Sequence, residues 1–124
     1  MNKELKDTIY EKLNEVDTNT FYGLATPKFI EETKELNYIV YGWSGFKKNS
    51  IDRIDYYSVV IVRENFVPAE DIDKVIKSMT SIKGVRLADQ QANNQYVTEG
   101  NTNTIIEITS VHFATVTKGY YAIS

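Results

Sequence analysis

The sequence predicts a single-domain α+β protein, a two-layer sandwich. A mainly antiparallel sheet of four to five strands would carry two amphipathic helices on one face. The length of 124 residues fits one domain, 1–124, which can fold without a metal or a disulfide. Two segments have apolar residues at helical spacing. Segments rich in β-branched and aromatic residues follow one another through direct loops, which favours antiparallel pairing.

The first expected element is a helix near the start of the chain. Apolar residues recur there at spacings of four, four and three: Leu5, Ile9, Leu13 and Val16. This spacing places them on one stripe and predicts a helix over residues 3–16. Asn2 is the expected N-cap, and the turn-like cluster at 17–20 ends the helix.

Two strands are expected next. Residues 21–26 predict a short strand that Pro27 would end. The pattern over 28–34 is ambiguous. Residues 37–43 make a better strand, because they alternate tyrosine, tryptophan and β-branched residues that favour sheets.

The clearest strand covers residues 55–63. Its run of β-branched residues indicates burial on both faces, so we expect it to be central in the sheet. Residues 44–54 combine turn residues with charge and are expected to form the connection that precedes it.

A second helix is expected to begin around 67–71. Proline at the first helical position, Pro68, and acidic residues in the first turn suit the start of a helix. The apolar stripe continues through Ile72, Val75, Ile76 and Met79. Lys83 and Gly84 close the segment.

A polar loop over residues 90–104 follows a short strand expected at 85–88. The loop contains no His, Cys or Lys, and its one charged residue is Glu99. Structureless loops of this length are usually functional or disordered. We therefore expect this loop to be disordered in the free subunit and to become ordered when it binds a partner.

The last strand is expected over residues 104–117. Ile106 and Ile108 share one alternation phase, whereas Val111 and Phe113 share the other. A one-residue shift would place all four on one side, so the pattern predicts a β-bulge or a bend near Thr109 and Ser110.

Composition excludes several functional classes. Fourteen basic and seventeen acidic residues give a net charge of −3, which argues against a general nucleic-acid binder. The chain has no cysteine, which excludes thiolate zinc sites, disulfides and cysteine nucleophiles. It has no apolar run long enough for a membrane span and no apolar segment typical of a signal peptide, so we expect a cytoplasmic protein.

Catalytic, metal and cofactor sites are not expected. The single histidine, His112, lies within the last expected strand, and strict alternation puts Glu107 on the opposite face. His112 is therefore interpreted as a packed or half-exposed strand residue. Glu70, Asp71 and Asp73 crowd a helix start, where acidic residues favour the helix dipole, so they are not interpreted as a metal cluster.

A small basic and aromatic group is the best candidate for recognition. Lys47, Lys48 and Arg53 lie close in sequence to Trp43 and Phe46. Such a group could hold a phosphate backbone, but Asp52 and Asp55 flank Arg53. A protein contact is favoured, because tryptophan and arginine are the residue types that most often anchor one.

The order of these elements resembles that of the tail terminator proteins of long, non-contractile-tailed bacteriophages, also called tail-completion or head–tail joining proteins. The resemblance covers nearly the whole chain and rests on element order, length and texture, since the family has no sharp residue motif. The elements that carry it are the helix from Leu5 to Val16, the hairpin with a long tip from Tyr38 to Val62, the helix from Pro68 to Met79, a short strand, the polar loop and the strand Ile105–Thr109.

The resemblance implies a structural virion protein without a cofactor. It would form a ring, typically a hexamer, that ends tail polymerisation and joins the tail to the head. Its partners would be further copies of itself, the major tail tube protein and a head-completion connector protein. DNA would pass through the channel without specific binding, and there would be no membrane. The protein would assemble in the host cytoplasm and reside in the virion tail.

On this interpretation the hairpin tip at 43–54 and the loop at 90–104 are the docking surfaces. The candidate contact residues are Trp43, Phe46, Lys47, Lys48, Arg53, Asn94, Tyr96, Asn101 and Asn103. The alternative is a small, non-enzymatic ligand-binding or regulatory domain with a pocket between helices and sheet. Its candidate polar groups are Tyr38, Tyr56 and His112.

Overall fold

A computed structural model describes residues 1–33, 36–100 and 102–123 and confirms the α+β class. The described residues form three helices and one mainly antiparallel sheet of six strands, which is one helix and at least one strand more than expected. The elements in chain order are α1 (Lys3–Asn14), β1 (Thr20–Tyr22), α2 (Pro27–Glu32), β2 (Tyr38–Asn49), β3 (Asp52–Glu64), α3 (Ala69–Thr80), β4 (Arg86–Leu87), β5 (Asn93–Thr98) and β6 (Ile105–Thr117).

The strand order across the sheet is β1-β2-β3-β6-β4, and β5 also pairs with β6. Strand β1 runs parallel to β2, and the other pairs are antiparallel. Strand β3 is central as expected, because it pairs on both sides along nearly its whole length. The expected burial on both faces is wrong: the helix side is buried, whereas Tyr56, Ser58 and Val60 on the other face are only partly buried, since the described helices α1 and α3 cover one face. Strands β4 and β5 occupy the same side of β6 at successive positions, β4 at 113–114 and β5 at 105–110.

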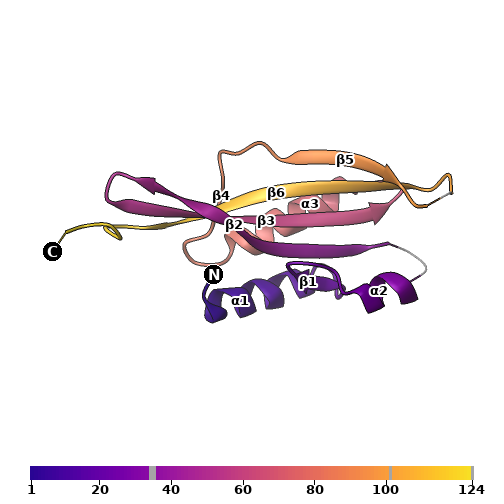
Figure 1. Cartoon of the computed structure of the whole chain (residues 1–124), viewed down its shortest axis with the longest axis horizontal. Helices are drawn as coiled ribbons and strands as arrows, with labels where there is room; N and C mark the ends of the chain where they lie inside the picture. The colour runs from indigo at the N-terminus through magenta and orange to yellow at the C-terminus, as the bar shows by residue number, and fades with distance from the viewer. Residues whose placement is uncertain (34–35, 101, 124) are drawn as a thin grey trace.

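Helices α1 and α3 cover one face of the sheet and enclose the core with it (Figure 1). The side-chain Oδ1 of Asn2 accepts the Leu5 N–H at 2.8 Å, which confirms Asn2 as the N-cap of α1. Pro68 is the N-cap of α3 rather than its first residue. The largest fully buried side chains are Phe113, Ile9, Leu13, Ile39, Ile61, Met79, Ile106, Val59 and Val75.

An ion-paired arginine connects the two helices to the sheet. Arg63 Nη1 lies 2.9 Å from Asp17 Oδ2, and its Nε lies 2.9 Å from Asp71 Oδ2. Asp17 follows α1, Asp71 lies in the first turn of α3, and Arg63 lies on β3. All three side chains are mostly buried. This cluster therefore fixes the relative position of three elements at one end of the core.

The long hairpin of β2 and β3 projects beyond the helical layer together with the end of β6 (Figure 1). We call this projection the arm and define it as residues 43–56 with 115–121. The expected connection over 44–54 is wrong, because β2 continues to Asn49 and only Ser50 and Ile51 separate it from β3. The polar side chains of Lys47, Lys48 and Asn49 lie on a projecting strand where neither face requires apolar residues, so their polarity does not indicate a turn.

Two further expectations about local structure are wrong. Pro27 does not simply end a strand: it begins the short helix α2, whose Thr26 N-cap accepts the Phe29 N–H. The loop over 90–104 is not structureless, because its residues 93–98 form β5, which pairs with β6.

The expected bulge near Thr109 and Ser110 is also wrong. β6 pairs with β3 without a register shift from Ile106 to Thr117. The change of phase arises because Val111 and Phe113 face the helices, whereas Ile106 and Ile108 face the opposite side of the sheet. A β-bulge occurs instead in β2, between Trp43 and Gly45.

Candidate interaction surfaces

The arm carries a cluster of aromatic and charged side chains on its helix-side face. Arg53 contacts the Asp55 carboxylate through Nε and Nη2, with the shortest distance 3.1 Å between Nη2 and Oδ1. Trp43 Nε1 donates to the same Oδ1 at 3.0 Å. The hydrogen bond between Arg53 and Asp55 raises the pKa of Arg53. Asp55, which in the sequence reads as diluting the charge of Arg53, therefore orients the guanidinium.

Aromatic rings lie against the charged centre of this cluster. The guanidinium carbon of Arg53 lies 4.0 Å from the Phe46 ring centroid and 5.0 Å from that of Tyr120. The rings of Trp43 and Phe46 stack with centroids 6.2 Å apart. We call Trp43, Phe46, Arg53, Asp55 and Tyr120 the arm cluster. Tyr120 is not among the predicted contact residues, although the apolar residues at 120–123 indicate a segment that packs against another part of the protein.

The arm cluster is accessible to a partner. Trp43 is 40% exposed and Phe46 is 53% exposed, and Tyr120 is exposed as well. Lys48 approaches the Tyr121 ring, 5.5 Å from its centroid, so it belongs to the same face. Exposed aromatic groups of this kind beside an arginine are typical of protein contact sites.

The segment after β6 is anchored to the hairpin turn. The Gly119 N–H donates to Asp52 Oδ1 at 2.8 Å, and Lys118 Nζ lies 3.2 Å from Asp52 Oδ2. The hydrogen bond from the Gly119 N–H lowers the pKa of Asp52, and Lys118 lowers it further by a smaller amount. Tyr121 donates its main-chain N–H to the Ile51 carbonyl at 2.8 Å. These bonds hold Tyr120 over Arg53.

A second candidate group lies at the opposite end of β6, on β5 (Figure 1). Asn94 Nδ2 donates to Glu107 Oε2 at 2.9 Å, and Thr109 Oγ1 donates to Asn94 Oδ1 at 2.6 Å. The hydrogen bond from the Val67 main-chain N–H lowers the pKa of Glu107 most, and hydrogen bonds from Asn94 and Tyr96 lower it further. Tyr96 is 66% exposed. Asn94 is therefore held in place, whereas the Tyr96 ring faces solvent.

The structure thus separates the nine candidate contact residues. Trp43, Phe46, Lys48 and Arg53 lie together on one face of the arm. Asn94 and Tyr96 lie on β5, and Asn103 is exposed in the turn before β6. Asn101 falls outside the described residues. Lys47 lies on the other face of the arm.

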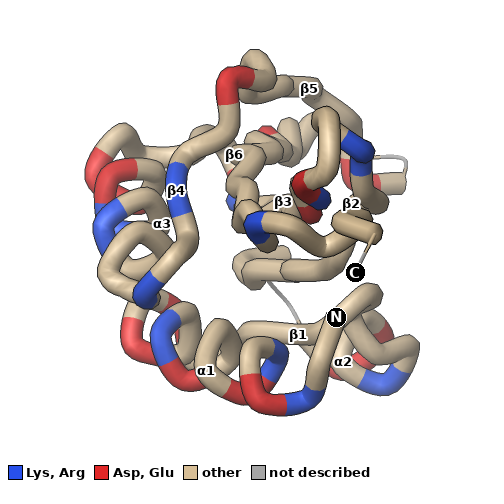
Figure 2. Tube along the Cα trace, turned by 90° about the vertical axis from the view of Figure 1, so that its left-hand side faces the viewer, with Lys and Arg blue, Asp and Glu red and all other residues tan. Residues whose placement is uncertain are grey.

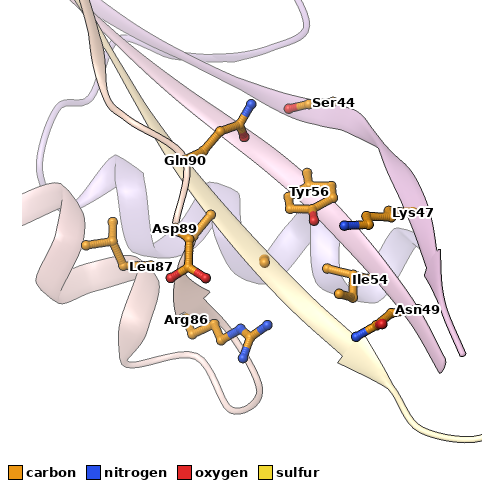
Figure 3. A pocket seen from close by; sticks show the side chains of 11 residues that line it. Ser44, Lys47, Asn49, Ile54, Tyr56, Arg86, Leu87, Asp89 and Gln90 are labelled. Carbon is orange, nitrogen blue, oxygen red and sulfur yellow. The ribbon is translucent and has the colours of Figure 1, made fainter.

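Lys47 lines a pocket of about 580 Å³. Figure 3 shows the side chains of the arm, including Lys47, Ile54 and Tyr56, on one side of this pocket, and Arg86, Asp89 and Gln90 on the other. A second hollow of about 950 Å³ lies between the helix-side face of the arm and the ends of α1 and α3. Of the three polar groups of the ligand-binding alternative, only Tyr56 lines either pocket.

A chain of hydrogen bonds crosses four strands on the face away from the helices. Ser44 Oγ lies 2.7 Å from Ser58 Oγ, which lies 3.2 Å from His112 Nδ1. Asn93 Nδ2 lies 3.4 Å from His112 Nε2. Serine beside histidine resembles a nucleophile and its base. Which ring nitrogen of His112 donates depends on its tautomer. The chain of contacts links β2, β3, β6 and β5 across the sheet.

Charge is distributed unevenly over the fold. Figure 2 shows that much of the charge lies on the helices. No group of three or more His, Cys, Asp or Glu side chains suited to a metal occurs within 1–33, 36–100 and 102–123. None of the helices in these ranges is long and apolar enough to cross a membrane. The sequence matches no protein-family model and no curated protein.

Proposed function

We propose that this protein is a structural virion component, a bacteriophage tail terminator. It closes into a homo-oligomeric ring, a hexamer, at the head-proximal end of the tail tube. There it stops tube polymerisation and joins tail to head. The observation that carries this proposal is the arm cluster, an exposed set of aromatic rings organised around Arg53 on a hairpin that projects beyond the core.

A projecting hairpin suits an assembly protein for a physical reason. Arg53 is held by Asp55, so its guanidinium and the Phe46 ring are ordered before a partner arrives. A preordered contact loses less conformational entropy on binding. A cyclic ring requires a contact between two different surfaces of the same chain, repeated until it closes. The arm and β5 lie at opposite ends of the molecule and both carry exposed groups, which supports assigning these two surfaces to them.

The other partners follow from the same proposal. The major tail tube protein would contact one face of the ring, and a head-completion connector protein would contact the other. The net charge of −3 favours a channel through which DNA passes without adhering, because like charges repel. The ring assembles in the host cytoplasm and becomes part of the virion tail, and it has no catalytic activity.

The test combines native mass spectrometry with electron microscopy of the purified protein, alone and with polymerising tail tube protein. We expect a closed ring that caps one end of each tube and stops its growth. Phe46→Ala should weaken ring formation, and Phe66→Ala is the matched control, because Phe66 is a similarly exposed phenylalanine next to α3. A protein that stays monomeric at every concentration and ignores tube ends would contradict the proposal.

One observation favours a second candidate, a small ligand-binding domain. The pocket of about 580 Å³ beside the arm has a size found in small-molecule sites, and it brings Lys47, Arg86 and Asp89 close to Ile54 and Leu87. A thermal-shift screen of small anionic metabolites tests it. Stabilisation that Arg86→Ala abolishes, in a protein that remains monomeric, would favour this function over ring formation.

A further inference from the structure

The outer edge of β5 carries main-chain groups that no strand in the described part of the chain pairs with. The Ala88 N–H donates to the His112 carbonyl, so the even-numbered residues of β6 direct their main-chain groups toward β4 and β5. β5 pairs Gln95 with Ile108. The main-chain groups of Asn93, Gln95 and Val97 are therefore bonded to β6, and those of Asn94, Tyr96 and Thr98 point away from the sheet.

The arm also has an open edge. The Ile39 N–H and the Tyr41 carbonyl bond to the β1 segment, so the odd-numbered residues of β2 face that way. Strand β1 ends at Tyr22, opposite Tyr41. Beyond it the bulge shifts the register by one residue. The main-chain groups that point outward along the arm are consequently those of Trp43, Phe46 and Lys48. No strand among the described residues pairs with them.

The two open edges differ in their charge. Strand β2 carries Lys47 and Lys48 and no acidic residue. Strand β5 is uncharged and is bordered by Asp89, Glu99 and the Glu107 side chain. Lysines and bulges on an edge discourage pairing with a like edge. Two β2 edges would place lysines together, and two β5 edges would place carboxylates together. Unlike edges attract each other instead.

We propose that β5 of one copy pairs with the arm edge of β2 of the next copy, so that the sheet continues from subunit to subunit. This inference rests on the proposed ring, because it specifies the contact between neighbours. The two edges lie on opposite sides of the same sheet, so each copy offers one of each. Such a contact repeats head to tail and closes under cyclic symmetry.

The direction of the new pair follows from the topology. Within the sheet β5 runs antiparallel to β6, which runs parallel to β2, so β5 and β2 are antiparallel. When the next copy continues the sheet with its helices on the same face, its strands run in the same directions as those of the first copy. The pair between subunits is therefore antiparallel, with Asn94 opposite Lys48 and Thr98 near Trp43.

The side chains support this arrangement. Tyr96 pairs with Glu107, and Phe46 pairs with Asp55, so both rings lie on the helix side of the sheet. In the continued sheet Tyr96 would cover the exposed Phe46 of the neighbouring subunit. Lys48, on the same face, would approach the neighbour's Glu107. The contact would therefore bury aromatic residues that each isolated copy exposes.

Disulfide trapping tests the edge contact directly, because the protein has no cysteine of its own. Two variants, Lys48→Cys/Asn94→Cys and Lys48→Cys/Thr98→Cys, differ only in the second position. Within one chain β2 and β5 are three strand spacings apart, about 14 Å, which is too far for a disulfide. Mild oxidation of the Asn94 variant should give a covalent ladder up to the closed ring on a non-reducing gel.

Each outcome decides the inference. A stronger ladder from the Asn94 variant supports antiparallel pairing of β5 with β2. A stronger ladder from the Thr98 variant overturns the proposed direction. Dimers from Asn94→Cys alone indicate pairing of β5 with β5 and overturn the proposal. Absence of any ladder while native mass spectrometry still shows the ring rejects the edge contact but leaves the proposed function intact. A protein that is monomeric throughout rejects both.

Proline substitutions give a second, independent test. Tyr96→Pro removes an outward N–H without removing a bond to β6, whereas Gln95→Pro removes a bond within the sheet. Tyr96→Ala is the control for loss of the tyrosine side chain. We expect Tyr96→Pro to have the same melting temperature as Tyr96→Ala. Its dissociation constant for the oligomer should be at least tenfold higher than that of Tyr96→Ala. Equal dissociation constants for these two variants would overturn the proposal. Gln95→Pro should lower the melting temperature.

Discussion

The guanidinium carbon of Arg53 lies 4.0 Å from the centre of the Phe46 ring, and both side chains project from the same hairpin outside the main core. A guanidinium and an aromatic ring that stack in this way form an ordered surface on the arm. The arrangement depends on Asp55, which bonds to Arg53 and Trp43 together. Recognition on the arm is therefore expected to depend on the planar guanidinium and not on positive charge alone.

Replacing Arg53 tests this dependence. Arg53→Ala should raise the dissociation constant of the oligomer at least tenfold, about 1.4 kcal/mol, because it removes a group typical of contact hot spots. Arg53→Lys keeps the charge but loses the two-pronged bond to Asp55, so it should recover only part of the affinity. Sedimentation velocity over a concentration series measures both effects.

The matched control for Arg53 is Lys77→Ala, which removes one exposed cation from α3. We expect it to leave the dissociation constant unchanged. Full recovery of assembly by Arg53→Lys would show that charge alone suffices and would contradict the role given to the stacked, bidentate geometry.

The helices and the central strand could be predicted from the sequence because their signals are local. The stripe through Leu5, Ile9 and Leu13 and the cap at Asn2 determine α1. The β-branched run at 55–63 predicts a central strand, and β3 pairs with a neighbour on each side. In these segments the core itself requires a periodic pattern, so the pattern can be recognised without knowledge of the fold.

β5 could not be predicted in this way. All six of its residues are exposed, so neither face requires apolar side chains and no alternation marks it as a strand. Its sequence from Asn93 to Thr98 is polar, and it forms a strand because β6 offers it a partner. The arm between 44 and 54 was missed for the same reason, since it projects beyond the helices.

The candidate site was predicted in part. Trp43, Phe46 and Arg53 were identified from proximity in sequence, and a tight hairpin keeps such neighbours close in space. Tyr120 was not, because it is 67 residues from Arg53 and reaches it through the pairing of β3 with β6. A contact that depends on strand register leaves no mark in a local pattern.

Arg63 provides a test of the core. Arg63→Met should lower the free energy of unfolding by about 3 kcal/mol, because it leaves Asp17 and Asp71 mostly buried without their shared cation. Lys3→Ala breaks the pair of Lys3 with Asp7, whose side chains are exposed, and should change it by less than about 0.5 kcal/mol. Urea denaturation measures both. Equal effects of the two substitutions would show that burial of the Arg63 ion pairs does not determine their contribution to the free energy of unfolding.

Ser50 tests the stability of the arm. Ser50 has a φ of 58° at the first position of the two-residue turn, a conformation in which non-glycine residues are strained. Ser50→Gly should relieve this strain and slow hydrogen exchange of the Asn49 and Asp52 amides. Ser50→Val should do the opposite, because a β-branched residue is disfavoured at positive φ. Unchanged exchange in both variants would exclude strain at this turn.

Glu107 connects pH to stability at the other end of β6. Its pKa is lowered in the folded protein from an ordinary value of 4.5, first by the Val67 N–H and then by Asn94 and Tyr96. A lowered carboxyl pKa contributes stability that is fully present above pH 4.5 and is lost as the pH falls through the folded-state pKa. Glu107→Gln should therefore be less stable than the native protein at pH 7, and the difference should shrink as the pH falls below about 4.

Urea denaturation between pH 3 and 7 measures this, with Glu11→Gln on the exposed face of α1 as the control for loss of one charge. A difference between native protein and Glu107→Gln that stays constant over this range would show that the hydrogen bonds to Glu107 do not favour its charged form.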